Sequence, residues 1–246
     1  MSIALLADIH ANREALTACL NHARARGATD FVFLGDYVGY GAEPLFAVEC
    51  VAEHVAKGAI AVMGNHDSAV LEPSVRMNDT ARIAIEWTRN QLDAGARTFL
   101  DRLPLAVGTD DRLYVHGDAS APSQWNYVLD TEDAALSLNS TRARLTVCGH
   151  VHVPALYGMS QTGKLTRFRP IAGTPIPLLR QRRWLAVLGS VGQPRDGSCA
   201  SSYALFREAA GEITFERVPY DVETAAAKIR AAGLPDVLAQ RLRAGR

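Results

Sequence analysis

Residues 3–10 read Ile3-Ala4-Leu5-Leu6-Ala7-Asp8-Ile9-His10, an apolar run that ends in an aspartate and a histidine. A short, continuous apolar run followed by polar groups is typical of a strand buried on both faces. Asn12 comes next and is expected to cap a helix, because apolar residues then recur at helical spacing: Ala15, Leu16, Cys19, Leu20 and Ala23. The chain therefore begins with a strand, a polar loop and a helix.

The same arrangement recurs further along the chain. Strand candidates at 31–34, 59–62, 113–115 and 145–148 lead into Gly35-Asp36, Gly64-Asn65-His66-Asp67, His116-Gly117 and Gly149-His150-Val151-His152. In open α/β sheets, ligands collect beyond the carboxyl ends of the strands. We therefore expect these loops and the first one to meet at one edge and to form a single polar site.

The rest of the pattern predicts a mixed α/β fold with two sheets and helices outside them. Helical spacing covers about 43–57, 79–92, 93–102, a stretch capped by Thr131, 222–232 and 235–243. After His152 the pattern becomes β-rich, with strand candidates at 153–157, 184–188, 202–206 and 213–218. Because we find no repeat or linker in the 246 residues, we expect a single domain over 1–246.

Composition limits the expected partners and location. Lys plus Arg and Asp plus Glu number 26 each, so we expect no bulk binding to nucleic acid or anionic lipid. The N-terminus has no basic flank and no apolar run is long enough to span a bilayer, so we expect neither a signal peptide nor membrane association. The four cysteines form no C-x-x-C pair, and we interpret them as buried, reduced thiols of a cytoplasmic protein: Cys19, Cys50, Cys148 and Cys199.

The polar loops carry residue types that suit two adjacent divalent ions. A carboxylate such as Asp36 has two oxygens and can bridge two metals, while neutral imidazoles suit Mn, Fe, Ni or Zn. Five of the seven histidines lie in these loops, and we interpret the other two, His22 and His54, as surface or packing residues. Each motif alone has a structural explanation, since Gly-Asp at a strand end is often only a turn. All of them in this order predict a metal site.

At these residues the sequence resembles the calcineurin-like metallophosphoesterases, whose pattern is D-x-H, G-D, G-N-H-[D/E], a later histidine and G-H-x-H. The resemblance covers residues 8 to 152. It implies a four-layer fold in which a two-sheet β-sandwich is flanked by helices. It also implies two transition-metal ions, one held by Asp8, His10, Asp36 and His152, and the other by Asp36, Asn65, His116 and His150.

The resemblance further implies roles for the remaining motif residues. His66 is expected to face the substrate beside Asn65, and to stabilise the transition state or protonate the leaving oxygen. Asp67 either orients His66 or only caps the segment that follows. The implied reaction is hydrolysis of a phosphodiester or phosphoanhydride by a metal-bridging hydroxide. The implied substrate is small, phosphorylated and nucleotide-like.

The sequence departs from one branch of this superfamily. Phosphoprotein phosphatases carry G-D-x-V-D-R-G, in which an acid orients the catalytic histidine and an arginine grips phosphate. This chain instead reads Gly35-Asp36-Tyr37-Val38-Gly39-Tyr40-Gly41. It looks more like the bacterial diadenosine-tetraphosphatase-like phosphodiesterases, also in the run from Gly189 to Gly197. Arg195 in that run is either a phosphate contact or a solvated arginine in a turn.

Other functions stay open at this stage. The same site would serve a cyclic-nucleotide or nucleic-acid phosphodiesterase, or a phosphomonoesterase. A non-catalytic scaffold is expected to lack several ligands, above all His66, and this chain retains them all. Four aromatic residues could line a base-stacking pocket, although aromatic side chains more commonly pack in a core: Trp125, Tyr127, Trp87 and Tyr40. The native metal and the oligomeric state stay open.

Overall fold

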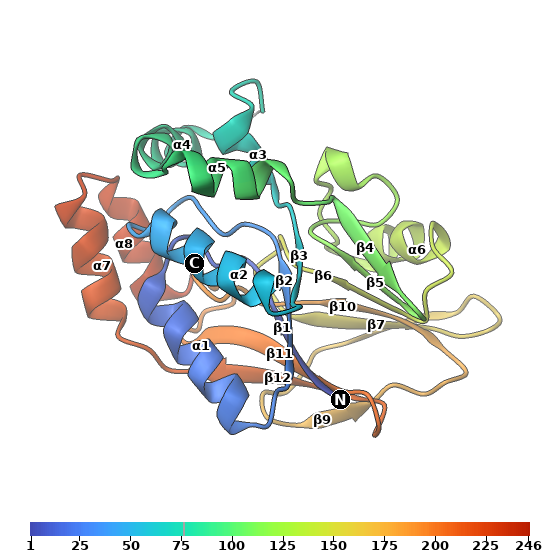
Figure 1. Cartoon of the computed structure of the whole chain (residues 1–246). Coiled ribbons are helices and arrows are strands. Elements are labelled where there is room, and N and C mark those ends of the chain that lie inside the picture. The colour runs from blue at the N-terminus through green and yellow to red at the C-terminus, as the bar shows by residue number, and fades with distance from the viewer. Residues whose placement is uncertain (76) are drawn as a thin grey trace.

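Two six-stranded sheets pack face to face in the computed structural model, which describes residues 1–75 and 77–246 (Figure 1). Helices cover the outer faces of the two sheets, so the layers run helix, sheet, sheet, helix. The predicted two-sheet fold is therefore confirmed.

The first sheet has the strand order β3-β2-β1-β11-β12-β9. Its parallel half consists of β1 (Ser2–Leu6), β2 (Asp30–Leu34) and β3 (Ile60–Val62), connected by the helices α1 (Arg13–Ala25) and α2 (Pro44–Ala56). Its antiparallel half consists of β11 (Ser201–Arg207), β12 (Glu212–Val218) and β9 (Pro175–Pro177). The N-terminal and C-terminal parts of the chain thus share one sheet.

The second sheet has the order β4-β5-β6-β10-β7-β8. Its strands are β4 (Ala106–Thr109), β5 (Arg112–Val115), β6 (Leu145–Cys148), β7 (Ala155–Met159), β8 (Leu165–Phe168) and β10 (Arg183–Val187). The polar loops therefore follow strands of two sheets, β1, β2 and β3 in the first and β5 and β6 in the second. The expectation of one sheet edge is corrected: face-to-face packing brings the carboxyl ends of both sets together.

The remaining helices lie mostly where the periodicity predicted them. They are α3 (Asn65–Leu71), α4 (Asp79–Gln91), α5 (Ala94–Asp101), η1 (Pro122–Gln124), α6 (Thr131–Asn139), α7 (Val222–Ala231) and α8 (Asp236–Ala244). Asn12 caps α1 as predicted, since its side chain accepts a hydrogen bond from the Ala15 amide. The cap of α6 is Asp130 rather than Thr131, because the Asp130 carboxylate accepts from two amides of the first turn.

The opening strand is apolar throughout because its two faces enter different cores. Ala4 and Leu6 pack against the helices α1 and α2, whereas Leu5 and Ala7 pack against the second sheet. This alternation is the period of two that a pleated strand imposes. A third apolar layer lies between α6 and the outer face of the second sheet.

Two expectations about individual side chains are refined by the structure. Cys19 and Cys148 are buried, but Cys50 is half-buried and Cys199 is exposed in the loop before β11, so the expectation of four buried thiols is wrong. The histidines outside the motifs do pack as expected: the His22 ring contacts the Tyr203 hydroxyl, and His54 lies edge-on to Phe31. Among the described residues, no helix has the length and apolar character needed to cross a membrane.

Candidate metal centre

The loops at the strand ends turn their side chains inward through an uncommon backbone conformation. Positive φ angles occur at 56° for Asp8, 48° for His10, 55° for Asp36, 68° for His150 and 64° for His152. Such angles cost on the order of 1 kcal/mol each for residues with a Cβ and persist only where the surroundings enforce them. Here the loops hold one another, as in the hydrogen bonds from the amide of Asp8 to the carbonyl of Gly35 and from that of His10 to Asp36.

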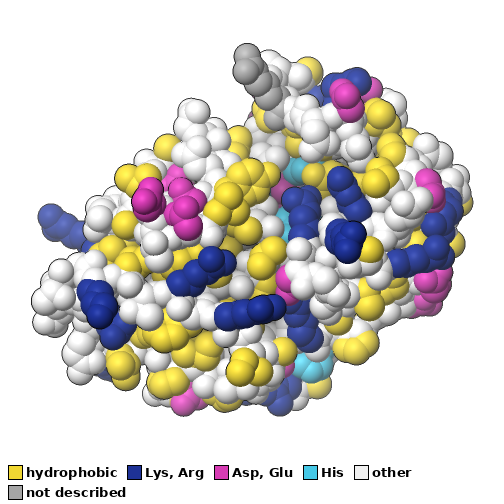
Figure 2. Space-filling model, turned by 180° about the vertical axis from the view of Figure 1, so that it is seen from behind, with side chains coloured by type: hydrophobic (Ala, Val, Ile, Leu, Met, Phe, Trp, Pro, Cys, Tyr) yellow, Lys and Arg dark blue, Asp and Glu magenta, His cyan; other side chains and the backbone are white. Residues whose placement is uncertain are grey.

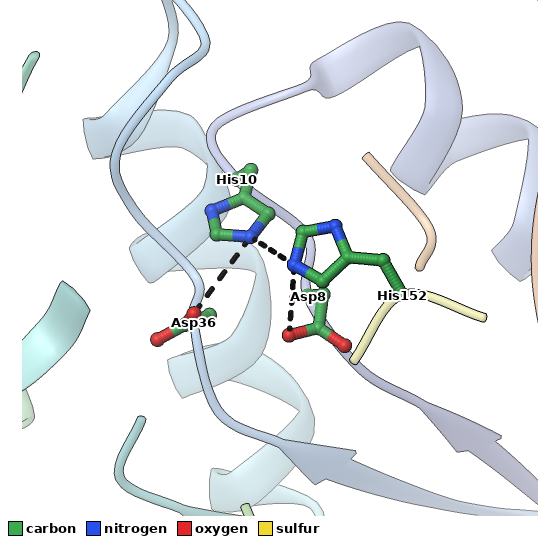
Figure 3. A group of neighbouring side chains, drawn as sticks. All are labelled: Asp8, His10, Asp36 and His152. Carbon is green, nitrogen blue, oxygen red and sulfur yellow. Dashed lines mark hydrogen bonds and ion pairs between the residues drawn. The ribbon is translucent and has the colours of Figure 1, made fainter. Parts of the chain in front are cut away.

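Asp8, His10, Asp36 and His152 form the first group of side chains that the loops bring together (Figure 3). All four are buried, and each offers one atom within 4.8 Å of the others. The Nε2 atom of His10 lies 3.1 Å from that of His152 and 3.7 Å from Oδ2 of Asp36. The Nε2 atom of His152 lies 3.5 Å from Oδ1 of Asp8.

The two histidines of this group point lone pairs at each other. His10 Nδ1 lies 3.1 Å from the Val38 carbonyl and His152 Nδ1 lies 2.6 Å from the Gln193 carbonyl. A carbonyl only accepts, so Nδ1 carries the proton and Nε2 the lone pair in both rings. Burial lowers the pKa of both imidazoles well below the ordinary value, which keeps them neutral. Two facing lone pairs 3.1 Å apart repel unless a cation lies with them, so this group fits a metal ion.

A second group lies beside the first and consists of Asp36, His116 and His150. His116 Nε2 lies 3.0 Å from His150 Nδ1, 3.4 Å from Asp36 Oδ2 and 3.2 Å from the amide oxygen of Asn65. His116 Nδ1 is 2.6 Å from the Leu34 carbonyl and donates to it. Burial lowers the pKa of His116, but the Asp36 carboxylate outweighs burial and raises it to about 9, so a bound metal ion would have to displace the proton from Nε2. Burial lowers the pKa of His150 to about 3, which keeps that ring neutral.

Asp36 belongs to both groups and lies between them. Its Oδ1 accepts a hydrogen bond of 2.8 Å from the His66 amide, while Oδ2 faces His10 and His116. Burial raises the pKa of this carboxyl, but the neighbouring imidazoles outweigh burial and hold it well below its usual range. The other carboxylate, Asp8, accepts from the His150 amide, and burial raises its pKa to about 7. A buried carboxylate needs a positive partner, which a metal ion supplies.

His66 adjoins these groups without belonging to either. Its ring centroid lies 4.9 Å from that of His10 and 4.5 Å from that of Tyr40. Its Nδ1 is buried and has no hydrogen-bond partner among the described residues. Burial lowers the pKa of His66 to about 4. In the space-filling view, histidine side chains lie on the floor of a hollow that opens to the surface (Figure 2).

Asp67 binds backbone rather than His66. Its carboxylate accepts hydrogen bonds from the amides of Gly64 at 2.9 Å, Asp36 at 2.8 Å and Tyr37 at 2.9 Å. Over the described part of the chain, it makes no hydrogen bond to the His66 ring. Of the two roles expected from the sequence, the capping role fits this geometry: Asp67 ties the loop after β3 and the start of α3 to the loop after β2.

Three of the four singled-out aromatic residues lie against histidines of the site, and Arg195 adjoins one of them. The Tyr127 ring stacks on His150 with centroids 4.0 Å apart, and 46% of Tyr127 is exposed. Tyr40 is buried beside His66, and Trp125 lies 6.0 Å from His116. The guanidinium of Arg195 lies 3.4 Å from the Tyr40 hydroxyl. Trp87 instead packs against an apolar cluster formed mainly by α4, α7 and α8, which also includes Tyr40.

The sequence and the fold of this chain are similar to those of known phosphoesterases. A family model described as "Calcineurin-like phosphoesterase superfamily domain" matches residues 1–211. The uncharacterized protein MJ0912 of Methanocaldococcus jannaschii is 36% identical over 251 residues, covering 99% of this chain and 98% of that protein. A crystal structure of a metallophosphoesterase from Sphaerobacter thermophilus is similar with a TM-score of 0.89 and 36% identity, covering 100% of this chain and 99% of the other. Hypothetical protein PH1004 from Pyrococcus horikoshii shares the fold with a TM-score of 0.79 and 18% identity, covering 100% and 98%.

Proposed function

This chain belongs to the calcineurin-like phosphoesterase superfamily, and from that premise we propose that it is a dinuclear metal-dependent phosphoesterase acting on phosphodiester or phosphoanhydride bonds. The observation that carries the proposal is the pair of ligand groups that share Asp36. Both groups combine carboxylate oxygens with imidazole nitrogens, and the second adds the Asn65 amide oxygen. Mixed oxygen and imidazole ligands suit Mn, Fe, Ni or Zn.

Two divalent ions held in this way would lower the pKa of a shared water toward neutrality and neutralise charge on the phosphate. The chain supplies the frame around them. The carbonyls of Val38, Leu34 and Gln193 fix the orientation and tautomer of His10, His116 and His152. A hydrogen bond from the other ring nitrogen commonly orients a metal-binding histidine and raises its basicity as a ligand.

His66 is the group that we assign to the leaving oxygen. It is buried next to His10 and Tyr40, and neither ligand group includes it. A side chain that belongs to neither ligand group is free to contact the phosphate together with Asn65. A bound phosphate anion beside His66 would raise the lowered pKa of the ring, so that His66 could hold a proton and donate it as the bond breaks. General-acid help of this kind contributes about 10²- to 10⁴-fold to a rate.

Arg195 and Tyr127 are the residues that we assign to the substrate. Arg195 forms no ion pair within the described ranges, and its guanidinium lies 3.4 Å from both the Tyr40 hydroxyl and the Gln193 side-chain oxygen. An unpaired guanidinium beside the hollow offers the forked donors that phosphate oxygens prefer. The exposed ring of Tyr127 lies beside the second ligand group, where a nucleobase could stack. A small, nucleotide-like phosphate compound fits these features.

Metal analysis followed by a substrate panel tests the proposal. Protein stripped by a chelator and reloaded separately with Mn, Fe, Ni or Zn is expected to bind about two ions per chain. The panel contains bis-p-nitrophenyl phosphate, p-nitrophenyl phosphate, cyclic nucleotides and dinucleoside polyphosphates. We expect turnover of diesters or anhydrides in the loaded protein and none after chelation. Equal turnover by the stripped protein would overturn the metal-dependent function.

The panel also separates the alternatives. Preference for the monoester identifies a phosphomonoesterase, and preference for the cyclic nucleotides identifies a cyclic phosphodiesterase with the same ligands. A scaffold protein would bind metal and turn over none of the compounds. The gathering of all ligand residues and His66 in one buried site favours catalysis over a scaffold.

A further inference from the structure

A groove of about 680 Å³ is lined in part by residues that adjoin the ligand loops along the chain. One wall continues the ligand loops: Val153 and Pro154 follow His152, and Arg195 follows Gln193, whose carbonyl holds the His152 ring. The opposite wall comes from β12 and from β8 with the segment after it. Arg195 therefore lies at the junction between the metal centre and the groove.

The walls of this groove carry positive charge that the protein does not neutralise. Four arginines line it: Arg167, Arg169, Arg195 and Arg217. Its two acidic residues are already paired, Asp196 with Arg217 and Glu216 with Arg26. Among the described residues, neither Arg167, Arg169 nor Arg195 forms an ion pair. The chain as a whole has a formal net charge of zero, so the positive charge of this groove is local.

The surface view agrees with this charge distribution. The hollow that exposes the histidines has Lys and Arg side chains along its sides, and further basic side chains extend away from it (Figure 2). A few acidic side chains also show in and near the hollow (Figure 2). A ligand that bridges the metal centre and the groove would therefore meet basic groups along its length.

Strand register places Arg169 nearer to the ligand loops than Arg167, which pairs with Tyr157. Leu156 of β7 pairs with Phe168 of β8, so Arg169 comes alongside the start of β7, a few residues after His152. At about 3.3 Å per residue in a strand, three residues correspond to roughly 10 Å. This span suits two phosphate groups joined through a sugar or through further phosphates.

We propose that the groove formed by Arg167, Arg169 and Arg195 binds a second phosphate group of the substrate. The inference rests on the proposed function and deepens it by naming the substrate class: a nucleotide with at least two phosphate groups, one at the metals and one in the groove. Guanidinium groups bind phosphate oxygens in pairs, and a fixed charge away from the reacting bond contributes to kcat/KM.

Two matched ligands test binding independently of turnover. Calorimetry on the metal-loaded protein compares adenosine 3′,5′-bisphosphate with AMP, which has one phosphate. In the R167A/R169A variant we expect the Kd of the bisphosphate to rise about tenfold, because loss of hydrogen bonds to a charged group weakens binding by about this factor. The Kd of AMP should change by less than about twofold. The control variant R142A/R180A removes two exposed arginines outside the groove, and should bind both ligands as the wild type does.

Activity provides the second arm of the test. The kcat/KM of R167A/R169A should fall about tenfold for a dinucleoside tetraphosphate and stay within about twofold for bis-p-nitrophenyl phosphate, which has no second phosphate. Equal losses on both substrates, or unchanged bisphosphate binding, would overturn the groove assignment. The two proposals can fail separately. If the wild type binds the bisphosphate through these arginines but hydrolyses none of the compounds with any metal, the proposed function is wrong and the phosphate-binding role of the groove is supported.

Discussion

The Nδ1 atom of His66 lies against the backbone of Gly39, so closely that a Cβ atom at position 39 would stand 2.3 Å from it. Gly39 has a φ of +82°, and the ring of the following residue, Tyr40, lies 4.5 Å from the His66 ring. The phosphoprotein phosphatase motif has an acid at this place, and this chain has none. His66 is therefore positioned by packing between Gly39 and Tyr40 rather than by a carboxylate.

A methyl group at position 39 should displace His66. We expect Gly39→Ala to lower kcat on the preferred diester by about 100-fold, because the proposed acid leaves its position. Gly163→Ala is the matched control, since Gly163 has a φ of +81° and nothing within 4 Å of its Cβ position. Both variants share a backbone cost of about 1 kcal/mol, so only the contact with His66 differs. Steady-state kinetics with metal analysis checks this, and a normal kcat for Gly39→Ala contradicts it.

Removal of the His66 ring should separate metal binding from turnover. His66→Ala is expected to keep about two metals per chain and to lose about 10²- to 10⁴-fold in kcat, because neither ligand group includes His66. His54→Ala removes a histidine of α2 that packs on Phe31, and should turn over normally. Elemental analysis and kinetics on the same preparations provide the measurement. Normal turnover by His66→Ala would show that another group protonates the leaving oxygen.

Substitution of Asp67 should lower the stability of the fold, whereas substitution of His66 should lower the rate of turnover. Asp67→Ala leaves the buried amides of Gly64, Asp36 and Tyr37 without their acceptor. Each unsatisfied amide costs about 1–3 kcal/mol, so the free energy of unfolding should fall by at least about 3 kcal/mol. Urea denaturation measures it, with His66→Ala as the neighbouring control. Wild-type stability in Asp67→Ala would mean that the carboxylate has some role other than capping.

The four cysteines should differ sharply in reactivity. Cys199 is exposed, whereas burial raises the pKa of Cys19 to about 12 and raises that of Cys148 further. A raised pKa leaves less thiolate at any given pH, and the thiolate is the form that reacts. Iodoacetamide at about pH 8 should therefore modify Cys199 first, because its thiol is exposed to the reagent. Mass spectrometry follows the reaction, and Cys199→Ser removes the fast phase. Rapid modification of Cys148 in the folded protein would contradict the buried assignment.

The sequence allowed the strands that precede the polar motifs and the candidate ligand residues to be predicted because each has a local signal, whereas the strands β4, β8 and β9 were not predicted. The run from Ile3 to Ala7 is apolar on both faces, and the polar motif follows without a gap. The assignment of the motif strands to two sheets has no such signal, since strand partners depend on contacts between distant residues. Likewise, the seven-residue helix α3 is too short to show a helical period, and it was not predicted.

The orientation of the candidate ligand side chains could also not be predicted from the sequence. The rings of His10, His116 and His152 are held by the carbonyls of other loops, and a carbonyl is present whatever the residue type. The capping role of Asp67 and the packing of Gly39 on His66 similarly depend on loops meeting in space. Motif reading therefore predicts which residues gather, while the structure is needed to say what positions them.

The shared position of Asp36 leads to a prediction about metal stoichiometry. His152→Ala removes a ligand of the first group only, and His150→Ala removes a ligand of the second group only, so each should bind about one ion tightly. Asp36→Asn keeps the side-chain shape but has one carbonyl oxygen, and cannot bridge, so occupancy of both positions should fall. Bound metal stabilises the folded state by mass action, so the Tm of metal-loaded protein should be highest for the wild type and lowest for Asp36→Asn. Elemental analysis and thermal denaturation measure the two quantities, and two tightly bound ions in Asp36→Asn would show that the groups are independent.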